Sequence, residues 1–272
     1  MSKKIRVAVV GVGGCASALI QGIQFYINSP DDEIGIMYKD IGGYSANDIE
    51  FVAGFDVDKR KVGKRLNEAI YSLPNCNMQI IAPHSDMSCI ASTAMVHRSP
   101  TLDGIAPHML EVPEDISFRE SNANPLTPDQ YKKILLDSKV DVLLNYVPVG
   151  SEEAARWHIE NAISIGVHIV NCMPTYISTN DAKKLEKLAV ENGVTIVGSD
   201  MRSAVGASRL SEVLQGMFLD AGLYVTQHIQ ENKACGTTQG DNRISGRSAN
   251  TDFMNMMKQD RQIGRASCRE RV

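Results

Sequence analysis

The feature that most constrains this chain is a glycine-rich turn between a predicted strand and a predicted helix, within residues 4–17 (KIRVAVVGVGGCAS). The β-branched run before the turn favours a strand, and the apolar residues after it recur at helical spacing. Gly11, Gly13 and Ala16 match the G-x-G-x-x-G/A pattern of dinucleotide-binding turns. An ordinary glycine-rich turn is the alternative, but the flanking strand and helix favour a phosphate-binding one.

Each small residue of this turn has a physical role in the prediction. Gly11 allows the tight turn, Gly13 lets a pyrophosphate approach the backbone, and Ala16 lets the helix pack closely on the strand. The helix N-terminus would direct free N–H groups and a positive dipole end at the phosphates. We therefore expect the cofactor to be bound by Gly11, Gly13, Gly14, Cys15, Ala16 and Ser17.

Composition restricts the partners and the compartment. With 272 residues and 43% hydrophobic content, the chain is large enough for one large domain or one and a half. A net charge of −4 gives no electrostatic case for nucleic acid or an anionic membrane, and no apolar run reaches transmembrane length. The six cysteines lack C-x-x-C spacing, which fits reduced thiols in the cytoplasm, and the histidines show no metal-ligand spacing.

Predicted strands and helices alternate along most of the chain. Strands are expected at 50–55, 94–98, 140–146, 167–171, 194–198 and 223–230, and helices after the glycine turn and at 59–71, 128–138, 152–165, 180–191 and 204–221. Ser151 is the expected N-cap of the helix that follows it. This alternation predicts an α/β fold with a doubly wound parallel sheet.

Ligands of such sheets bind beyond the carboxyl ends of the strands. Asp56 ends the second strand, where a carboxylate would bind the ribose hydroxyls and repel a 2′-phosphate, which favours NAD over NADP. It follows Gly11 by 45 residues because of an insertion at 28–48, and a strand-end turn residue is the alternative interpretation. The other strand-end loops, 145–151, 171–176 and 199–203, favour a second bound anion beside the nucleotide.

Six motifs occur in a fixed order: 11–17 (GVGGCAS), 55–58 (FDVD), 101–104 (TLDG), 146–154 (YVPVGSEEA), 196–203 (IVGSDMRS) and 250–256 (NTDFMNM). Together they resemble the myo-inositol-1-phosphate synthase (inositol-3-phosphate synthase) family of bacterial and archaeal type, over residues 4–230 and 250–257. The resemblance implies conversion of glucose 6-phosphate to an inositol phosphate without net redox change. In that reaction NAD⁺ oxidises C5, an enolate at C6 attacks the C1 aldehyde, and NADH reduces the cyclic ketone.

The resemblance also implies roles for individual residues. Tyr146, Pro148, Gly150 and Ser151 would border the cofactor, and Asp200 would lie near the nicotinamide and orient a catalytic lysine. Asp252 and Asn255 would face the reacting sugar, whose phosphate would be bound by Arg202, Ser203, Ala204 and Val205. Helix capping is the alternative role for Asp200 and Asp252. The family further implies a homotetramer and a role in inositol and phospholipid biosynthesis. Some members of the family use a divalent metal, but no ligand cluster in this sequence assigns one.

The same resemblance suggests the domain organisation. We expect a NAD-binding Rossmann domain at 1–203, an incomplete catalytic and tetramerisation domain at 204–262, and a non-native tail at 263–272 that reads like a translated sequencing adapter. The chain ends before the lysine-rich catalytic segment of the family, so we expect impaired assembly through exposed apolar faces. A net NAD-dependent dehydrogenase and a non-catalytic NAD-binding protein are the competing functions.

Overall fold

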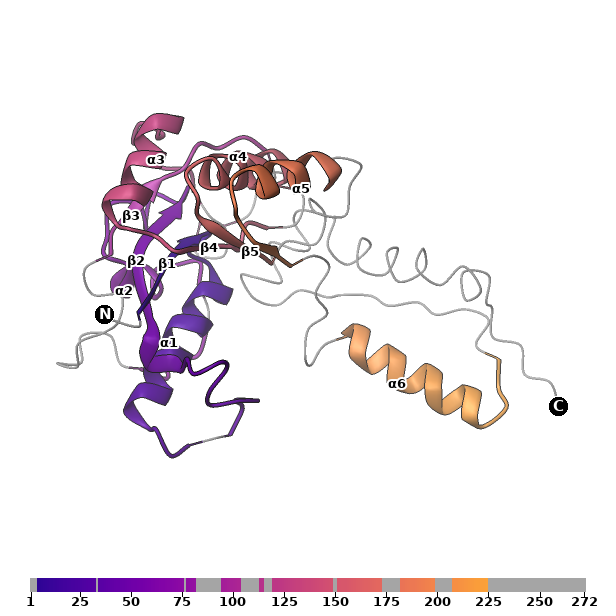
Figure 1. Ribbon diagram of the computed structural model, residues 1–272. Helices are drawn as coiled ribbons and strands as arrows, with labels where there is room; N and C mark the ends of the chain where they lie inside the picture. Colours follow the sequence, from indigo (N-terminus) through magenta and orange to yellow (C-terminus); the bar gives the residue numbers. More distant parts are fainter. Residues whose placement is uncertain are drawn as a thin grey trace.

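The strands form one parallel sheet in the order β3-β2-β1-β4-β5-β6 (Figure 1). The computed structural model describes residues 4–32, 34–75, 77–81, 94–103, 113–114, 119–148, 151–172, 182–198 and 207–224. The chain leaves β1 toward β2 and β3, then crosses back to pair β4 with the other side of β1. This is the Rossmann order, and the reversal places a topological switch point between β1 and β4. The predicted α/β fold with a doubly wound parallel sheet is confirmed.

The elements follow one another in the predicted alternation. Their bounds are β1 (Ile5–Val10), α1 (Gly14–Asn28), η1 (Ala46–Asp48), β2 (Ile49–Asp56), α2 (Leu66–Ala69), β3 (Val96–Arg98), α3 (Pro128–Asp137), β4 (Val142–Asn145), α4 (Glu152–Ile163), β5 (His168–Asn171), α5 (Ala182–Glu191), β6 (Ile196–Val197) and α6 (Ala207–Asp220). The strand predicted at 223–230 lies outside the described residues except for its first two, which are not in a strand. No helix in the described part of the chain is both long and apolar enough to cross a membrane.

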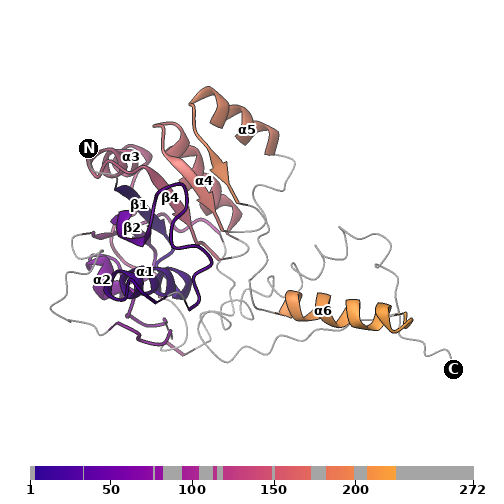
Figure 2. The same ribbon diagram turned by 60° about the horizontal axis from the view of Figure 1, so that its bottom comes forward.

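Helices cover both faces of the sheet, α1 and α2 on one and α3, α4 and α5 on the other (Figures 1 and 2). Successive residues of a strand point to opposite faces, so β1 contributes to both layers. Val7 and Val9 pack with α1 and α2, whereas Ala8 and Val10 pack with α3 and α4. An uninterrupted apolar strand is therefore what a sheet buried on both faces requires.

The apolar core between the sheet and helices α3 and α4 contains a buried aromatic cluster. His158 of α4 lies with its ring centroid 5.0 Å from that of Tyr131 and 4.9 Å from that of Trp157. Burial lowers the pKa of His158 to about 3 and raises that of Tyr131. His158 Nδ1 and Tyr131 Oη have no hydrogen-bond partner among the described residues, so this polar pair is held inside an apolar layer.

One predicted helix start is confirmed in detail, at α3. The Thr127 side chain accepts from the Gln130 N–H, and the Gln130 side chain accepts from the Thr127 N–H. This reciprocal capping box, followed by Pro128 at the first helical position, is a local arrangement that sequence spacing alone can predict.

The helix predicted at 59–71 is wrong, because only α2 within it is helical. The Asp58 carboxylate accepts from the Arg60 N–H, 2.7 Å away, and Gly63 takes a φ of +82°, so the chain turns after β2. The backbone around Gly63 and Lys64 then bonds to Val96 of β3 instead of forming helical hydrogen bonds. Pairing with a distant strand overrides the local helical spacing here.

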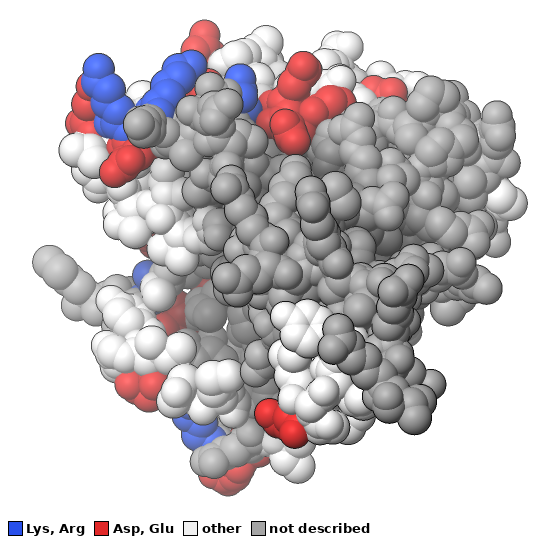
Figure 3. Space-filling model, turned by 90° about the vertical axis from the view of Figure 1, so that its right-hand side faces the viewer, with Lys and Arg blue, Asp and Glu red and all other residues white. Residues whose placement is uncertain are grey.

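Acidic and basic side chains of the described residues lie beside one another on the face shown in Figure 3. The described surface pairs include Lys59 with Glu114 and Lys187 with Glu191. Exposed pairs of this kind contribute little to folding, so the burial of the sheet faces is the main source of stability.

Candidate functional site

The carboxyl ends of β1, β2, β4 and β5 meet at one edge of the sheet. Val10 lies beside Phe55 of β2 and Asn145 of β4, and Asn145 lies beside Asn171 of β5. The residues that follow each strand therefore lie at the same edge of the sheet, at the switch point where such folds bind ligands. The structure brings together the described members of the predicted cofactor site: Gly11, Gly13, Gly14, Cys15, Ala16, Ser17, Asp56, Tyr146, Pro148 and Ser151.

The glycine turn is held tightly on one side and open on the other. Gly11 has a φ of +83°, and a Cβ there would lie 2.8 Å from the carbonyl oxygen of Tyr146. Gly13 is extended, and a Cβ there would meet no atom of the described residues within 4 Å. The N-cap residue Gly13 has no side chain that could cap the N-terminus of α1. Open space beside free helix N–H groups is the geometry that accepts a phosphate.

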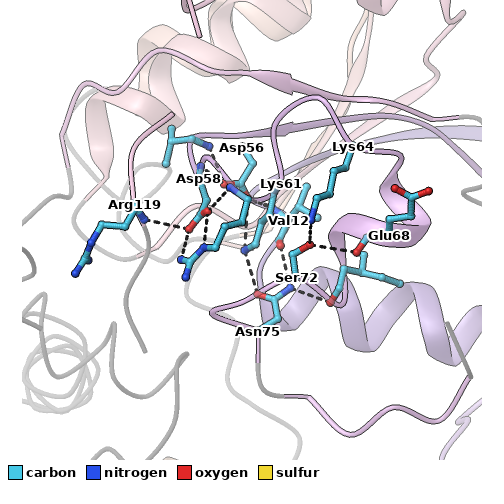
Figure 4. A network of polar contacts seen from close by, with 12 residues as sticks. Val12, Asp56, Asp58, Lys61, Lys64, Glu68, Ser72, Asn75 and Arg119 are labelled. Carbon is cyan, nitrogen blue, oxygen red and sulfur yellow. Dashed lines mark hydrogen bonds and ion pairs between the residues drawn. The ribbon is translucent and has the colours of Figure 1, made fainter. Parts of the chain in front are cut away.

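Asp56 is fixed at the end of β2 by backbone donors (Figure 4). Its Oδ2 accepts from the Val12 N–H of the glycine turn at 2.7 Å, and its Oδ1 accepts from the N–H groups of Val57 and Asp58 at 2.7 and 2.8 Å. These three bonds hold the carboxylate beside the turn and leave it further acceptor capacity. A pair of ribose hydroxyls is the ligand that such a placed carboxylate suits.

Tyr146 and two thiols lie together at this edge of the sheet. Burial raises the pKa of Tyr146, with Cys172 and Cys15 as neighbours, and the Tyr146 hydroxyl is hydrogen-bonded to the Cys172 thiol. Burial also raises the pKa of both thiols. At neutral pH this group is therefore uncharged, and Tyr146 presents a hydroxyl rather than a phenolate.

Two buried asparagines connect the ends of β4 and β5. Asn145 Nδ2 donates to Asn171 Oδ1 at 2.8 Å, and neither residue is exposed. The Asn145 backbone carbonyl also accepts from the Cys172 N–H at 3.0 Å. These bonds fix where the strand-end loops begin, which determines the positions of Tyr146 and Cys172.

Ser151 is the N-cap residue of α4, as predicted, but it does not supply the capping hydrogen bond. Its side chain makes no capping hydrogen bond to α4, although Glu152 and Glu153 lie in the first turn as predicted. The Asp103 carboxylate accepts instead from the N–H groups of Glu153 and Ala154, at 2.8 and 3.1 Å. The cap comes from a loop 50 residues earlier, and no local spacing rule could have found it.

Replacing Asp103 with alanine should therefore cost more stability than replacing Ser151. We expect Asp103→Ala to lower the free energy of unfolding by about 1 kcal/mol, because two helix N–H groups lose a charged acceptor. Ser151→Ala is the matched control and should cost less than half as much. Urea unfolding monitored by circular dichroism measures both. A larger loss for Ser151→Ala would contradict the assignment of Asp103 as the cap.

The remaining predicted site residues lie outside the described part of the chain. They are Gly150, Asp200, Arg202, Ser203, Ala204, Val205, Asp252 and Asn255. Among the residues that are described, no group of three His, Cys, Asp or Glu side chains could hold a metal ion.

Sequence reasoning missed three residues at this edge of the sheet. Asp103 lies in a motif that was recognised but had no role assigned. Lys61 was placed in a helix that does not form, and Asn75 lies in a stretch without periodicity. Asn75 Nδ2 donates to the Val12 carbonyl at 3.1 Å, and Lys61 Nζ donates to Asn75 Oδ1 at 3.1 Å. Only long-range contacts identify these two residues.

Two curated relatives align with nearly all of this chain. It is 38% identical over 263 residues to the inositol-3-phosphate synthase of Mycolicibacterium smegmatis, and 37% identical over 262 residues to that of Corynebacterium glutamicum. The alignments cover 95% and 94% of this chain but 63% of each relative, so the chain spans less than two thirds of their length. No family model matches the chain.

Two solved structures share the fold. The crystal structure of Ari2 has a TM-score of 0.64 and 27% sequence identity, covering 82% of this chain and 60% of Ari2. A myo-inositol-1-phosphate synthase-related protein from Thermotoga maritima has a TM-score of 0.59 and 19% identity, covering 82% of this chain and 61% of that protein. At this lower identity the second similarity is one of fold alone.

Proposed function

We propose that this chain belongs to the inositol-3-phosphate synthase family, binds NAD and acts in the conversion of glucose 6-phosphate to 1D-myo-inositol 3-phosphate. The observation that carries the cofactor part is the pairing of an open glycine turn with a fixed carboxylate. Gly13 leaves space at the N-terminus of α1, and Asp56 is bonded to the Val12 N–H of the same turn. The substrate and the reaction rest on the relatives.

The residues at this edge of the sheet fit a dinucleotide. The pyrophosphate would lie against Gly13 and the first N–H groups of α1, and the adenosine ribose against Asp56. A carboxylate at this place disfavours a 2′-phosphate, so we propose NAD rather than NADP. When bound, NAD would supply hydride acceptance and donation.

The protein side chains at the opposite side would orient and shield the reacting groups. The neutral Tyr146 hydroxyl can donate a hydrogen bond, and the paired asparagines of β4 and β5 hold its loop in place. We assign the substrate phosphate to Arg202, Ser203, Ala204 and Val205 by family position. Asp200, Asp252 and Asn255 are assigned to the reacting sugar and the nicotinamide on the same basis. The family relationship also supports a cytoplasmic homotetramer in inositol and phospholipid biosynthesis.

A three-way assay tests the proposed function. The purified chain is incubated with NAD⁺ and glucose 6-phosphate, and phosphorus NMR is used to detect inositol phosphate while absorbance at 340 nm follows free NADH. Inositol phosphate formed without accumulating NADH supports the proposed reaction. Stoichiometric NADH without inositol phosphate would instead identify a dehydrogenase.

Cofactor binding is measured separately by titration calorimetry with NAD⁺. Binding without either product would identify a non-catalytic NAD-binding protein and overturn the proposed reaction. A chain that binds no NAD⁺ would overturn the cofactor assignment as well. Light scattering of the same sample reports whether the chain forms a tetramer.

A further inference from the structure

Lys61 is a buried lysine beside the carboxylate proposed to bind ribose (Figure 4). Its side chain is 5% exposed, and its Nζ lies 3.9 Å from Asp56 Oδ2 and 3.1 Å from Asn75 Oδ1. Asn75 in turn donates to the Val12 carbonyl, while the Val12 N–H donates to Asp56. These four residues thus form a closed ring of polar contacts that includes Val12, the middle residue of the glycine turn.

The other cations of this basic segment have separate partners. Arg60 Nη2 lies 2.6 Å from Asp58 Oδ2, and Lys59 Nζ lies 2.6 Å from Glu114. Lys64, which is exposed, donates to the Ser72 hydroxyl at 3.0 Å. Within residues 59–64, Lys61 is therefore the cation whose described ion-pair partner is Asp56.

Removing the Asp56 carboxylate would leave Lys61 buried without that counter-ion. An uncompensated buried ammonium is costly, so the site would favour any anion that can take the place of the carboxylate. The N–H groups of Val12, Val57 and Asp58 would lose their acceptor at the same time. A 2′-phosphate offers three acceptor oxygens and more negative charge than a carboxylate, so it suits this set of donors.

We propose that Lys61 is a specificity-determining residue that Asp56 masks, and that exchange of this one carboxylate for a small neutral side chain converts the adenosine end from a 2′-hydroxyl site to a 2′-phosphate site. The inference rests on the proposed binding of NAD. Asn75 is the positioning residue, because its hydrogen bond holds the ammonium beside the turn when the carboxylate is absent.

Binding titrations on four proteins test this proposal. The probes are NAD⁺, NADP⁺, 5′-AMP and adenosine 2′,5′-bisphosphate, whose affinities are measured by calorimetry for the wild type, Asp56→Ser, Asp56→Ser/Lys61→Met and Asp56→Ser/Lys64→Met. We expect Asp56→Ser to gain about tenfold to a hundredfold in affinity for the 2′-phosphorylated probes, because a charge-assisted hydrogen bond has that value. Lys61→Met should abolish this gain, and the matched control Lys64→Met should retain it.

The outcomes separate the two proposals. A wild type that binds NAD⁺, with no gain for Asp56→Ser or a gain that survives Lys61→Met, would overturn the role of Lys61 and leave NAD binding intact. A wild type that binds neither dinucleotide would overturn both. Asp56→Asn serves as a second, isosteric variant if Asp56→Ser does not fold, as judged by circular dichroism, and the same Lys61-dependent gain is expected of it.

Discussion

Gly11→Ala should destabilise the fold by about 2–4 kcal/mol, the sum of a strained backbone and an unavoidable contact. Its φ of +83° is unfavourable for alanine, and the new Cβ would lie 2.8 Å from the Tyr146 carbonyl oxygen. That contact is with backbone at the end of β4, which is itself bonded to β1, so it cannot move aside without separating the central strands. Thermal and urea unfolding measure the loss.

Two other glycines provide controls for this prediction. Gly63 has a similar φ of +82°, and a Cβ there would meet no atom of the described part of the chain within 4 Å, so Gly63→Ala reports the backbone strain alone. Gly13 is extended with the same open space, so Gly13→Ala should cost less than about 1 kcal/mol, while NAD⁺ affinity falls by about tenfold or more. Equal losses of stability at Gly11 and Gly63 would contradict the proposed contact. Unchanged NAD⁺ affinity in Gly13→Ala would contradict the phosphate position.

His158→Leu should remove a large part of the acid sensitivity of the protein. The pKa of the buried imidazole is lowered to about 3, well below the ordinary value of 6.5. The unfolded chain therefore binds a proton below pH 6.5 that the folded chain does not, and stability falls as the pH falls. The slope is about 1.4 kcal/mol per pH unit, so the wild type should lose about 2 kcal/mol more than the variant between pH 6.5 and pH 5.

The same experiment contains its own reference at high pH. At pH 8 the imidazole is neutral in both states, so the difference between the two proteins there reports packing alone and should stay within about 1.5 kcal/mol. Urea unfolding at pH 8, 6.5, 5.8 and 5 gives the two curves. Parallel curves would show that His158 does not contribute to acid denaturation.

The elements that local spacing could predict are those whose stabilising contacts are local. The Thr127 and Gln130 capping box lies within four residues and needs no partner elsewhere. The alternation of buried runs with amphipathic segments likewise reflects burial of β1 on both faces, and it was sufficient for the parallel α/β fold. The family resemblance depended on short motifs, which are also local.

The errors occurred where distant groups decide the local structure. Residues 59–65 have the composition of a helix, but the N–H groups of Lys59 and Gly63 donate to the distant carbonyls of Arg119 and Val96. Ser151 stands at the N-cap position of α4, but the carboxylate that accepts from the N–H groups of the first turn belongs to Asp103, in another loop. In both places a non-local hydrogen bond is energetically as good as the local one, so sequence spacing cannot discriminate between them.

By itself, the sequence determined the βα turn at Gly11, the alternation that requires a parallel sheet, and the carboxylate at position 56, because each depends on residue type and near-neighbour spacing. Only the tertiary structure decided what surrounds that carboxylate. Lys61 donates to Asn75, 14 residues along the chain, and Asn75 donates to Val12, 63 residues back. Such contacts depend on strand order and register, which no single stretch of the sequence encodes.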